Sequence, residues 1–211
     1  MSPDEKPRRV RADAERSTAR ILAAAEEVLA ADPNATIERI ADAAGLARAT
    51  VHRRFSSRKA LLEALTCLLN ERYLSAIEQA RVATAPPVAA LHRLTELLFE
   101  LKVDNRAIME LTADPRTLRT PTNTEVDAAL DLLFTRLREA GEITAADPVW
   151  CRGVFLAVVH EAAQLAADSP DMPPVATGPA GETGARADLA FTTVLGALGA
   201  NVHRGRSNAG A

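Results

Sequence analysis

Apolar residues recur along this 211-residue chain at the spacing of α-helices. In the N-terminal segment they occupy positions i, i+1, i+4, i+7 and i+8, which line one face of a helix: Ile21, Leu22, Ala25, Val28 and Leu29. Two later stripes have the same period, and they comprise Leu91, Leu94, Leu98 and Leu101, then Val126, Ala129, Leu130, Leu133 and Leu137. No alternation long enough for a β-strand occurs. The pattern predicts an all-α fold.

Prolines, glycines and N-capping residues between the stripes predict where the later helices begin and end. Thr120-Pro121 and Asp147-Pro148 each pair an N-cap with a first-turn proline, and Gly141 ends the helix between them. Residues 169–184 hold four prolines and three glycines, so we expect a surface loop there. The expected helices after residue 57 cover 58–83, 87–103, 106–114, 121–141, 148–168 and 185–202.

Residues 36–55 predict two short helices about a tight turn. Ala41 is small where two steeply crossing helices approach, and Gly45 accepts the positive φ that such a turn needs. Thr36 is a good N-cap, and Glu38 stands in the first turn, where the helix dipole favours an acid. This spacing indicates a helix-turn-helix, although an ordinary helical hairpin with a solvated basic face would show it too.

The second of these helices is polar and basic on its outer faces. Ile37, Ile40, Leu46, Val51 and Phe55 can close a small shared core. The remaining residues are then free to enter a DNA groove: Arg48, Ala49, Thr50, His52, Arg53 and Arg54. Arg48 can donate two hydrogen bonds to guanine, and Ala49 can contact a thymine methyl group.

Three segments together closely resemble the N-terminal domain of the tetracycline-repressor (TetR) family of transcriptional regulators. They are RILAAA from residue 20, IADAAGL from residue 40 and ATVHRRFSSRKALL from residue 49. The resemblance covers residues 16–65. It implies phosphate contacts at Thr50, His52, Arg53 and Lys59, and Thr36 and Arg54 complete the set of expected DNA-binding residues.

Two positions depart from the family pattern. Ala47 stands where the family has a capping serine, which should cost about 1 kcal/mol of helix stability. His52 stands where the family has a tyrosine that reaches a phosphate. Because imidazole can gain a proton near neutral pH, we expect DNA affinity to rise modestly as the pH falls from about 7.5 to 6.

Charge is unevenly distributed along the chain. Residues 1–60 carry 12 Lys and Arg against 9 Asp and Glu, a net of +3, whereas the whole chain has a net charge of −3. A basic segment on an acidic body fits a local DNA-binding surface. Lys6, Arg8, Arg9 and Arg11 could follow a phosphate backbone, or belong to a disordered end.

The predicted organisation has four parts. Residues 1–15 form a disordered basic arm, 16–60 a three-helix DNA-binding domain, 61–203 a helical effector-binding and dimerisation domain, and 204–211 a disordered tail. The last two helices are too apolar for elements buried on one side only, and they are rich in Gly and Ala. In the resembled family they form a four-helix dimer interface, so we expect a homodimer through Phe155, Val158, Ala162, Leu165, Phe191, Val194, Leu195 and Leu198.

Effector binding is expected between the connecting helix and the dimer helices, as in the resembled family. Candidate lining residues are large, soft or polar: Cys67, His92, Phe99, Met109, Phe134 and Trp150. Each could equally fill space in a core. Because aromatic residues make up only 3% of the chain, we expect an aliphatic pocket for a small apolar effector, or no effector.

Other functional classes find little support in the sequence. It contains no H-E-x-x-H, G-x-S-x-G, phosphate-binding loop or dinucleotide fingerprint, so we expect neither an enzyme nor a cofactor. Cys67 and Cys151 lack metal-site spacing and are expected as reduced thiols, without a metal. Neither a signal peptide nor a membrane span is evident, which predicts a cytoplasmic protein. The hypothesis is a DNA-binding repressor; the alternative is a helical ligand-binding or adaptor protein.

Overall fold

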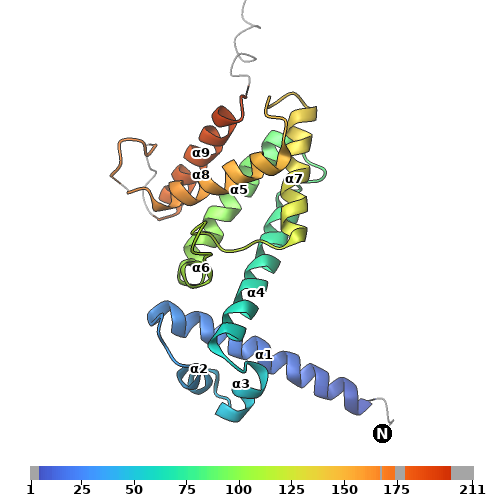
Figure 1. Ribbon diagram of the computed structural model, residues 1–211, viewed down its shortest axis with the longest axis vertical. Helices are drawn as coiled ribbons and strands as arrows, with labels where there is room; N and C mark the ends of the chain where they lie inside the picture. The colour runs from blue at the N-terminus through green and yellow to red at the C-terminus, as the bar shows by residue number, and fades with distance from the viewer. Residues whose placement is uncertain (1–4, 167, 174–178, 201–211) are drawn as a thin grey trace, which may run out of the picture. The chain divides into compact units, whose positions relative to one another are not determined.

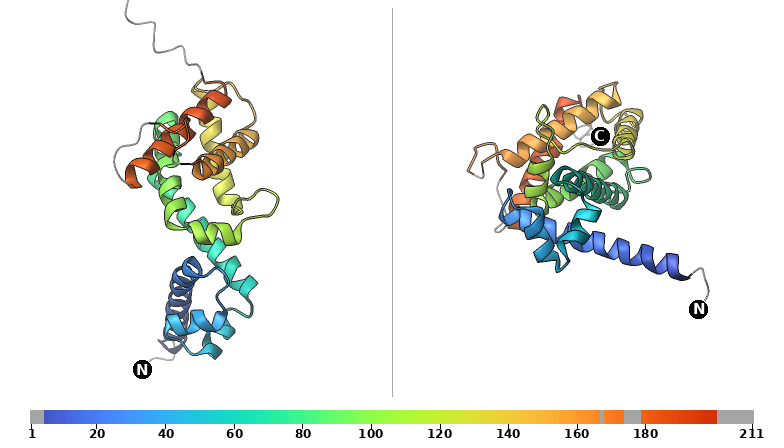
Figure 2. Two further views of the ribbon diagram at one scale, coloured as in Figure 1. Left: turned by 90° about the vertical axis from the view of Figure 1, so that its left-hand side faces the viewer. Right: turned by 60° about the horizontal axis from the view of Figure 1, so that its bottom comes forward.

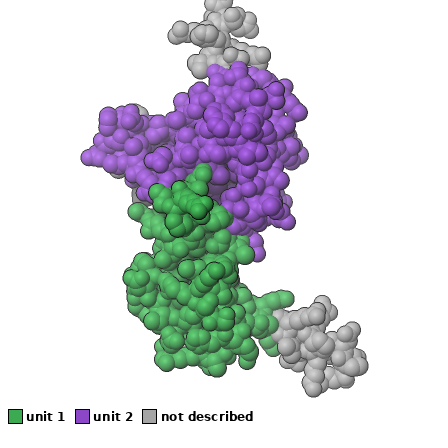
Figure 3. Space-filling model, in the orientation of Figure 1, with its two compact units in different colours: residues 1–69, 105–121 green, residues 70–104, 122–211 purple. Residues whose placement is uncertain are grey.

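The computed structural model describes residues 5–166, 168–173 and 179–200, which form helices and no strand (Figure 1). The all-α prediction is therefore confirmed for the described part of the chain. Packing divides the chain into two compact units (Figure 3). Unit 1 comprises residues 1–69 and 105–121, and unit 2 comprises residues 70–104 and 122–211.

Unit 1 is a small helical domain that contains the expected helix-turn-helix. Its helices are α1 (Glu5–Ala31), α2 (Ile37–Ala44), α3 (Arg48–Arg54), α4 (Arg58–Gln79) as far as residue 69, and α6 (Arg106–Thr112). α2 packs against α1 and α3, and α6 packs against α1. The fully buried side chains include Ile21, Ala25, Leu29, Ile40, Val51 and Leu61. Most lie on the stripes that the sequence predicts to face inward.

Unit 2 is a helical bundle around a larger apolar core. It contains the rest of α4 with α5 (Pro87–Asp104), α7 (Thr124–Glu139), α8 (Pro148–Gln164) and α9 (Pro179–Ala197). α9 lies alongside α5 and α8, and α8 also contacts α7 (Figure 2). The two predicted leucine-rich stripes supply much of this core: Leu91, Leu94, Leu98, Val126, Leu130, Leu133 and Leu137 are buried.

α1 begins earlier than the sequence predicts. The expected disordered arm covers residues 1–15, but the helix starts at Glu5. Pro7 falls in the first turn, where its missing N–H interrupts no helical hydrogen bond, so this proline does not exclude a helix. Residues 1–4 lie outside the described residues, as do the side chains of Lys6, Arg8, Arg9 and Arg11.

The connection before the last helix is shorter than expected. α8 ends at Gln164, and α9 begins at Pro179 rather than at Ala185. A proline suits the first position of a helix, so Pro179 starts this element instead of belonging to the loop. α9 ends at Ala197, and Gly199 follows with a φ of 75°. Val202 and the expected tail over 204–211 lie outside the described residues.

The compact units differ from the expected division after residue 60. The first turns of α4, as well as α6 and residues 113–121, group with the N-terminal helices. Ile108 of α6 is 3% exposed, and α6 packs on α1. This grouping depends on contacts between segments far apart in the sequence, which a local pattern does not reveal.

Candidate DNA-binding site

The turn between α2 and α3 has the geometry that its sequence predicts. Thr36 caps α2, because its hydroxyl oxygen accepts a hydrogen bond of 3.3 Å from the backbone N–H of Arg39. Gly45 adopts a φ of 63°, in the left-handed region that favours glycine. The N–H of Leu46 then donates to the carbonyl of Ala41 at 3.0 Å, which closes the end of α2.

α3 buries one side and leaves its basic side chains outward. Val51 is 0% exposed, and Phe55 after the helix is buried as well. Most of the expected contact residues are exposed, namely Arg48, Ala49, His52, Arg53, Arg54, Lys59 and Thr36, whereas Thr50 is half-buried. Ala47 precedes the helix without a side-chain cap, as its sequence predicts. The accessible face of α3 is therefore short, polar and cationic.

Two arginines fix the helix-turn-helix from outside it. The Arg20 guanidinium on α1 donates to the carbonyl of Ala44 at 2.7 Å and to that of Gly45 at 3.4 Å. The Arg58 guanidinium at the start of α4 donates to the carbonyl of Ala35 at 2.6 Å and also to that of Pro33. Sequence reasoning missed both roles, because a basic residue beside a DNA-binding helix gives no sign that its target is a backbone carbonyl.

Acidic side chains of α2 face the basic side chains of α3. Glu38 Oε1 lies 3.4 Å from His52 Nε2, and Asp42 Oδ2 lies 3.9 Å from Arg48 Nη2. Hydrogen bonds from its own backbone N–H, from the Thr36 hydroxyl and from His52 hold the pKa of the Glu38 carboxyl below its ordinary value. Two of the expected DNA-binding residues thus have anionic neighbours within the protein.

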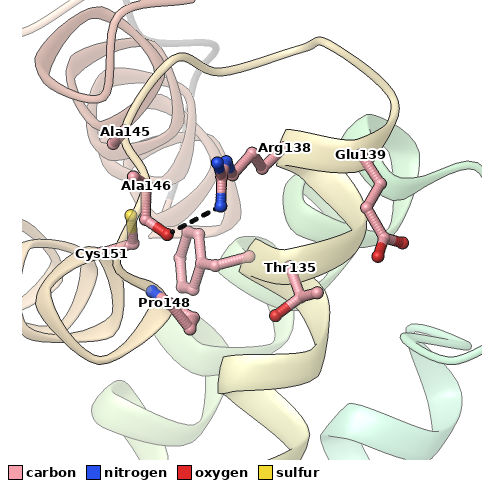
Figure 4. Close-up of a pocket in the computed structure, with 8 residues that line it drawn as sticks. Thr135, Arg138, Glu139, Ala145, Ala146, Pro148 and Cys151 are labelled. Atoms are coloured by element: carbon pink, nitrogen blue, oxygen red, sulfur yellow. Dashed lines mark hydrogen bonds between the residues drawn. The ribbon is translucent and has the colours of Figure 1, made fainter.

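One of the six expected effector residues lines a cavity within unit 2. A cavity of about 330 Å³ in unit 2 is lined by Phe134, Thr135, Arg138, Glu139, Ala145, Ala146, Pro148 and Cys151 (Figure 4). Figure 4 shows the Arg138 guanidinium directed at the Ala146 carbonyl oxygen, at 3.3 Å. Of the six candidates, only Phe134 belongs to this lining.

The other five candidates have different surroundings. Phe99 is buried in the core of unit 2, and Trp150 is 52% exposed at the start of α8. His92 lies 3.0 Å from a carboxylate oxygen of Asp188 and packs edge-on against Phe191. Cys67 and Met109 belong to unit 1. Large, soft or polar side chains on these helices therefore lie in the core and at the surface as well as in the cavity lining.

The expected dimer residues separate into two groups. Phe155, Ala162, Val194 and Leu198 are buried in the core of unit 2 within a single chain. Val158, Leu165, Phe191 and Leu195 are half-buried. The helical period identified the apolar positions but could not tell which of them face inward, because both helices are apolar on more than one side.

Small residues occupy part of the outward side of these two helices, beside exposed polar residues such as Glu161 and Thr192. Gly153 and Ala157 on α8, and Gly196 and Ala197 on α9, are exposed. A Cβ atom placed on Gly153 or Gly196 would meet nothing within 4 Å. This outward side, which we call the small-residue face, would allow the backbone of another helix to approach closely.

Metal binding and membrane insertion each require a recognisable arrangement of side chains. Among the described residues, no His, Cys, Asp and Glu side chains form a group that could hold a metal ion. None of the described helices is long and apolar enough to cross a membrane. Cys151 is buried, and this burial, followed by the nearby charge of Asp147, raises the pKa of its thiol.

Comparison with known proteins identifies the family. The model of the family described as bacterial regulatory proteins, tetR family, matches residues 21–65. The chain is 33% identical over 159 residues to the HTH-type transcriptional repressor LfrR of Mycolicibacterium smegmatis, which covers 73% of this chain and 81% of LfrR.

Solved structures agree with this assignment. The structure of LfrR from Mycobacterium smegmatis in complex with proflavine has a TM-score of 0.58 at 31% identity, covering 85% of this chain and 94% of that one. PfmR from Thermus thermophilus shares the fold, with a TM-score of 0.59 at 20% identity and coverage of 83% and 96%. The chain belongs to the TetR family of DNA-binding transcriptional regulators, and it is of the repressor type.

Proposed function

We propose that this protein represses transcription by binding a pseudo-palindromic operator as a homodimer, and that a small molecule releases it. The observation that carries the proposal is the outer face of α3, where exposed cations stand on a helix anchored by the fully buried Val51. A helix held in this way can enter the major groove as a rigid unit. A bacterial regulator of this kind works in the cytoplasm, where the chromosome lies.

Each contact residue has a role that follows from its side chain. Arg48 and Ala49, in the first turn of α3, read base edges through guanine and a thymine methyl group. Thr50, His52, Arg53 and Lys59 contact phosphates and so fix the register of the helix on the duplex. Thr36 and Arg54 lie at the edges of this surface and add phosphate contacts.

Dimerisation is supported by the small-residue face of α8 and α9. An exposed apolar surface of this kind in a bacterial regulator suits a second copy of the chain, because two copies would bury it. Two recognition helices about 34–36 Å apart would read successive major grooves, which explains the expected palindrome.

An effector is supported by the LfrR structure with bound proflavine. Release requires that the effector binds the DNA-free arrangement of the protein more tightly than the DNA-bound one. Because proflavine also binds DNA, the first test should use the protein alone. A rise in its melting temperature with proflavine concentration would support a binding site, and an unchanged melting temperature would speak against this class of effector.

The central experiment is capture of genomic DNA. Purified protein is incubated with fragmented DNA of its own genome at near-physiological salt, and the retained fragments are sequenced. A few enriched fragments that share an inverted repeat are expected. If all fragments are retained alike and added salt abolishes this retention, the protein binds DNA only nonspecifically, which favours the adaptor alternative.

A double substitution connects the captured DNA to α3. Thr50→Ala/Arg53→Ala should abolish retention while the protein stays a folded dimer by circular dichroism and sedimentation. Arg93→Ala is the matched control, since Arg93 is an exposed arginine on α5, paired with Glu96 at 3.1 Å. Equal retention by both variants would contradict the proposed role of α3.

A further inference from the structure

Two carboxylates of α2 are placed opposite an arginine and a histidine of α3. Glu38 and Asp42 are four residues apart and therefore share one face of α2. Arg48 and His52 are likewise four residues apart on α3. Glu38 Oε1 lies 3.4 Å from His52 Nε2, and Asp42 Oδ2 lies 3.9 Å from Arg48 Nη2. The four side chains therefore form two pairs between the helices. We call Glu38 and Asp42 the acidic pair.

The two pairs are too exposed to contribute much to the stability of the fold. The side chains of Asp42 and Arg48 are 68% and 64% exposed. Exposed ion pairs contribute little to folding, because water screens the charges and two long side chains lose freedom. The side chains of Glu38 and His52 are 42% and 47% exposed, so their pair contributes as little. Folding stability therefore does not explain the acidic pair, and its role concerns the DNA that α3 contacts.

Negative charge on this surface opposes DNA in general. Nonspecific DNA binding comes from neutralising phosphates and releasing counterions, and each cation that reaches a phosphate adds to it. An arginine that pairs with a carboxylate gains less free energy by contacting a phosphate, because it must give up the carboxylate. A guanine edge offers the arginine two well-aligned acceptors. Replacing the carboxylate by a base is therefore more favourable on a matching sequence.

We infer that Asp42 determines specificity, by holding Arg48 away from the phosphates of unmatched DNA until a guanine edge of the operator replaces the carboxylate, while Glu38 opposes the phosphate contact of His52 on DNA of any sequence. Discrimination is a difference between two affinities, and a repulsive element against the wrong partner increases it. This inference rests on the proposed function, since it requires α3 to be the helix that contacts DNA. The nearby Arg39 pairs with Asp32, with 2.8 Å between Nη1 and Oδ2.

The test removes each charge with little change of shape. Asp42→Asn and Glu38→Gln are compared with the parent on two duplexes, the inverted-repeat fragment recovered in the capture experiment and a scrambled fragment of equal length. We expect affinity for the scrambled fragment to rise roughly threefold to tenfold. The slope of log affinity against log salt concentration should become steeper by the amount that about one additional phosphate contact produces. For Asp42→Asn, affinity for the inverted repeat should change less than about twofold, so discrimination falls by the difference. Glu38→Gln should raise affinity for both duplexes alike, because His52 contacts a phosphate in either of them.

Glu110→Gln is the matched control. It removes one negative charge from the same unit and breaks an exposed pair, because Glu110 lies 2.9 Å from Arg106 within α6. We expect this variant to bind both duplexes like the parent. Circular dichroism should show all three variants folded.

Failure of the inference and failure of the proposed function give different results. If the parent discriminates between the duplexes and Asp42→Asn discriminates equally well, the inference is overturned and the proposed function stands. The same holds if Glu110→Gln raises nonspecific affinity as much as Asp42→Asn does. If the parent binds both duplexes no better than Thr50→Ala/Arg53→Ala does, the proposed function and the inference are both overturned.

Discussion

The Arg20 guanidinium of α1 donates a 2.7 Å hydrogen bond to the carbonyl oxygen of Ala44, the last residue of α2. The same nitrogen would lie 3.2 Å from a Cβ atom built on Gly45. A side chain at residue 45 would therefore meet both an unfavourable backbone conformation and the arginine that holds the turn. Arg20 connects the position of α2 to that of α1.

The first prediction concerns Gly45→Ala. At a φ of 63° an alanine costs about 1–2 kcal/mol, and its methyl group would displace Arg20. We expect lower thermal stability together with weaker DNA binding. Gly141→Ala is the control, because Gly141 has a φ of 71° but open space around its Cβ position. It should lose similar stability and keep DNA affinity; equal losses of affinity in both variants would contradict the role of Arg20.

The helix-turn-helix could be predicted because its determinants are local. A small Ala41, a glycine four residues later and a capping Thr36 each act within one turn of their own backbone, and the structure keeps all three roles. The buried Val51 follows from helical period. Side chains that reach across the fold could not be predicted in this way. Arg20 and Ala44 are 24 residues apart, and no periodicity records that contact.

The second prediction is that Ala47→Ser stabilises the protein. Ala47 precedes α3 with φ of −60° and ψ of 137°, and its side chain makes no capping hydrogen bond. A serine there can accept from a free N–H of the first turn, which is worth about 1 kcal/mol. For a chain of this size the melting temperature should rise by about 2–4 °C. Ala43→Ser, inside α2, should lower it slightly, and a rise in that control as well would rule out capping as the cause.

The third prediction distinguishes the two thiols. Cys67 is exposed, whereas Cys151 is buried and the pKa of its thiol is raised, so Cys151 holds less reactive thiolate near neutral pH. A thiol-reactive dye at a pH of about 8 should modify one cysteine quickly and the other only on unfolding. Cys67→Ser should remove the fast phase, and Cys151→Ser should keep it. A fast phase that survives in Cys67→Ser would show that Cys151 is accessible.

The fourth prediction is a modest rise in operator affinity as the pH falls from about 7.5 to 6, caused by protonation of His52. The Glu38 carboxyl does not change its charge in this window, because its pKa is lowered from the ordinary value. Its lowered pKa means that its stabilising effect is present above the ordinary value of 4.5 and is lost only as the pH falls through the lowered value. Operator affinity of His52→Tyr should change less with pH, and the same pH dependence as in the parent would exclude His52 as the cause.

The cavity and dimer residues were harder to predict than the recognition helix. Phe155 and Gly153 lie on the same helix, yet the first is fully buried in unit 2 and the second is exposed. Hydrophobicity alone favours Phe155 as the contact residue. In the structure the larger side chain packs in the core of unit 2 and the small residue is exposed, so we expect the small residues to contact a partner.

The last prediction follows from that expectation. Ala157→Glu places a charge at an exposed position of the small-residue face on α8, so sedimentation should show monomers in place of dimers. Operator affinity should fall about a hundredfold or more, since a monomer binds one half-site without the gain of a linked second contact. Leu132→Glu is the control, because Leu132 is 44% exposed on α7, outside this face. If Ala157→Glu remains dimeric, the contact between copies must lie elsewhere, and the outward Gly and Ala residues of α8 and α9 would need another partner.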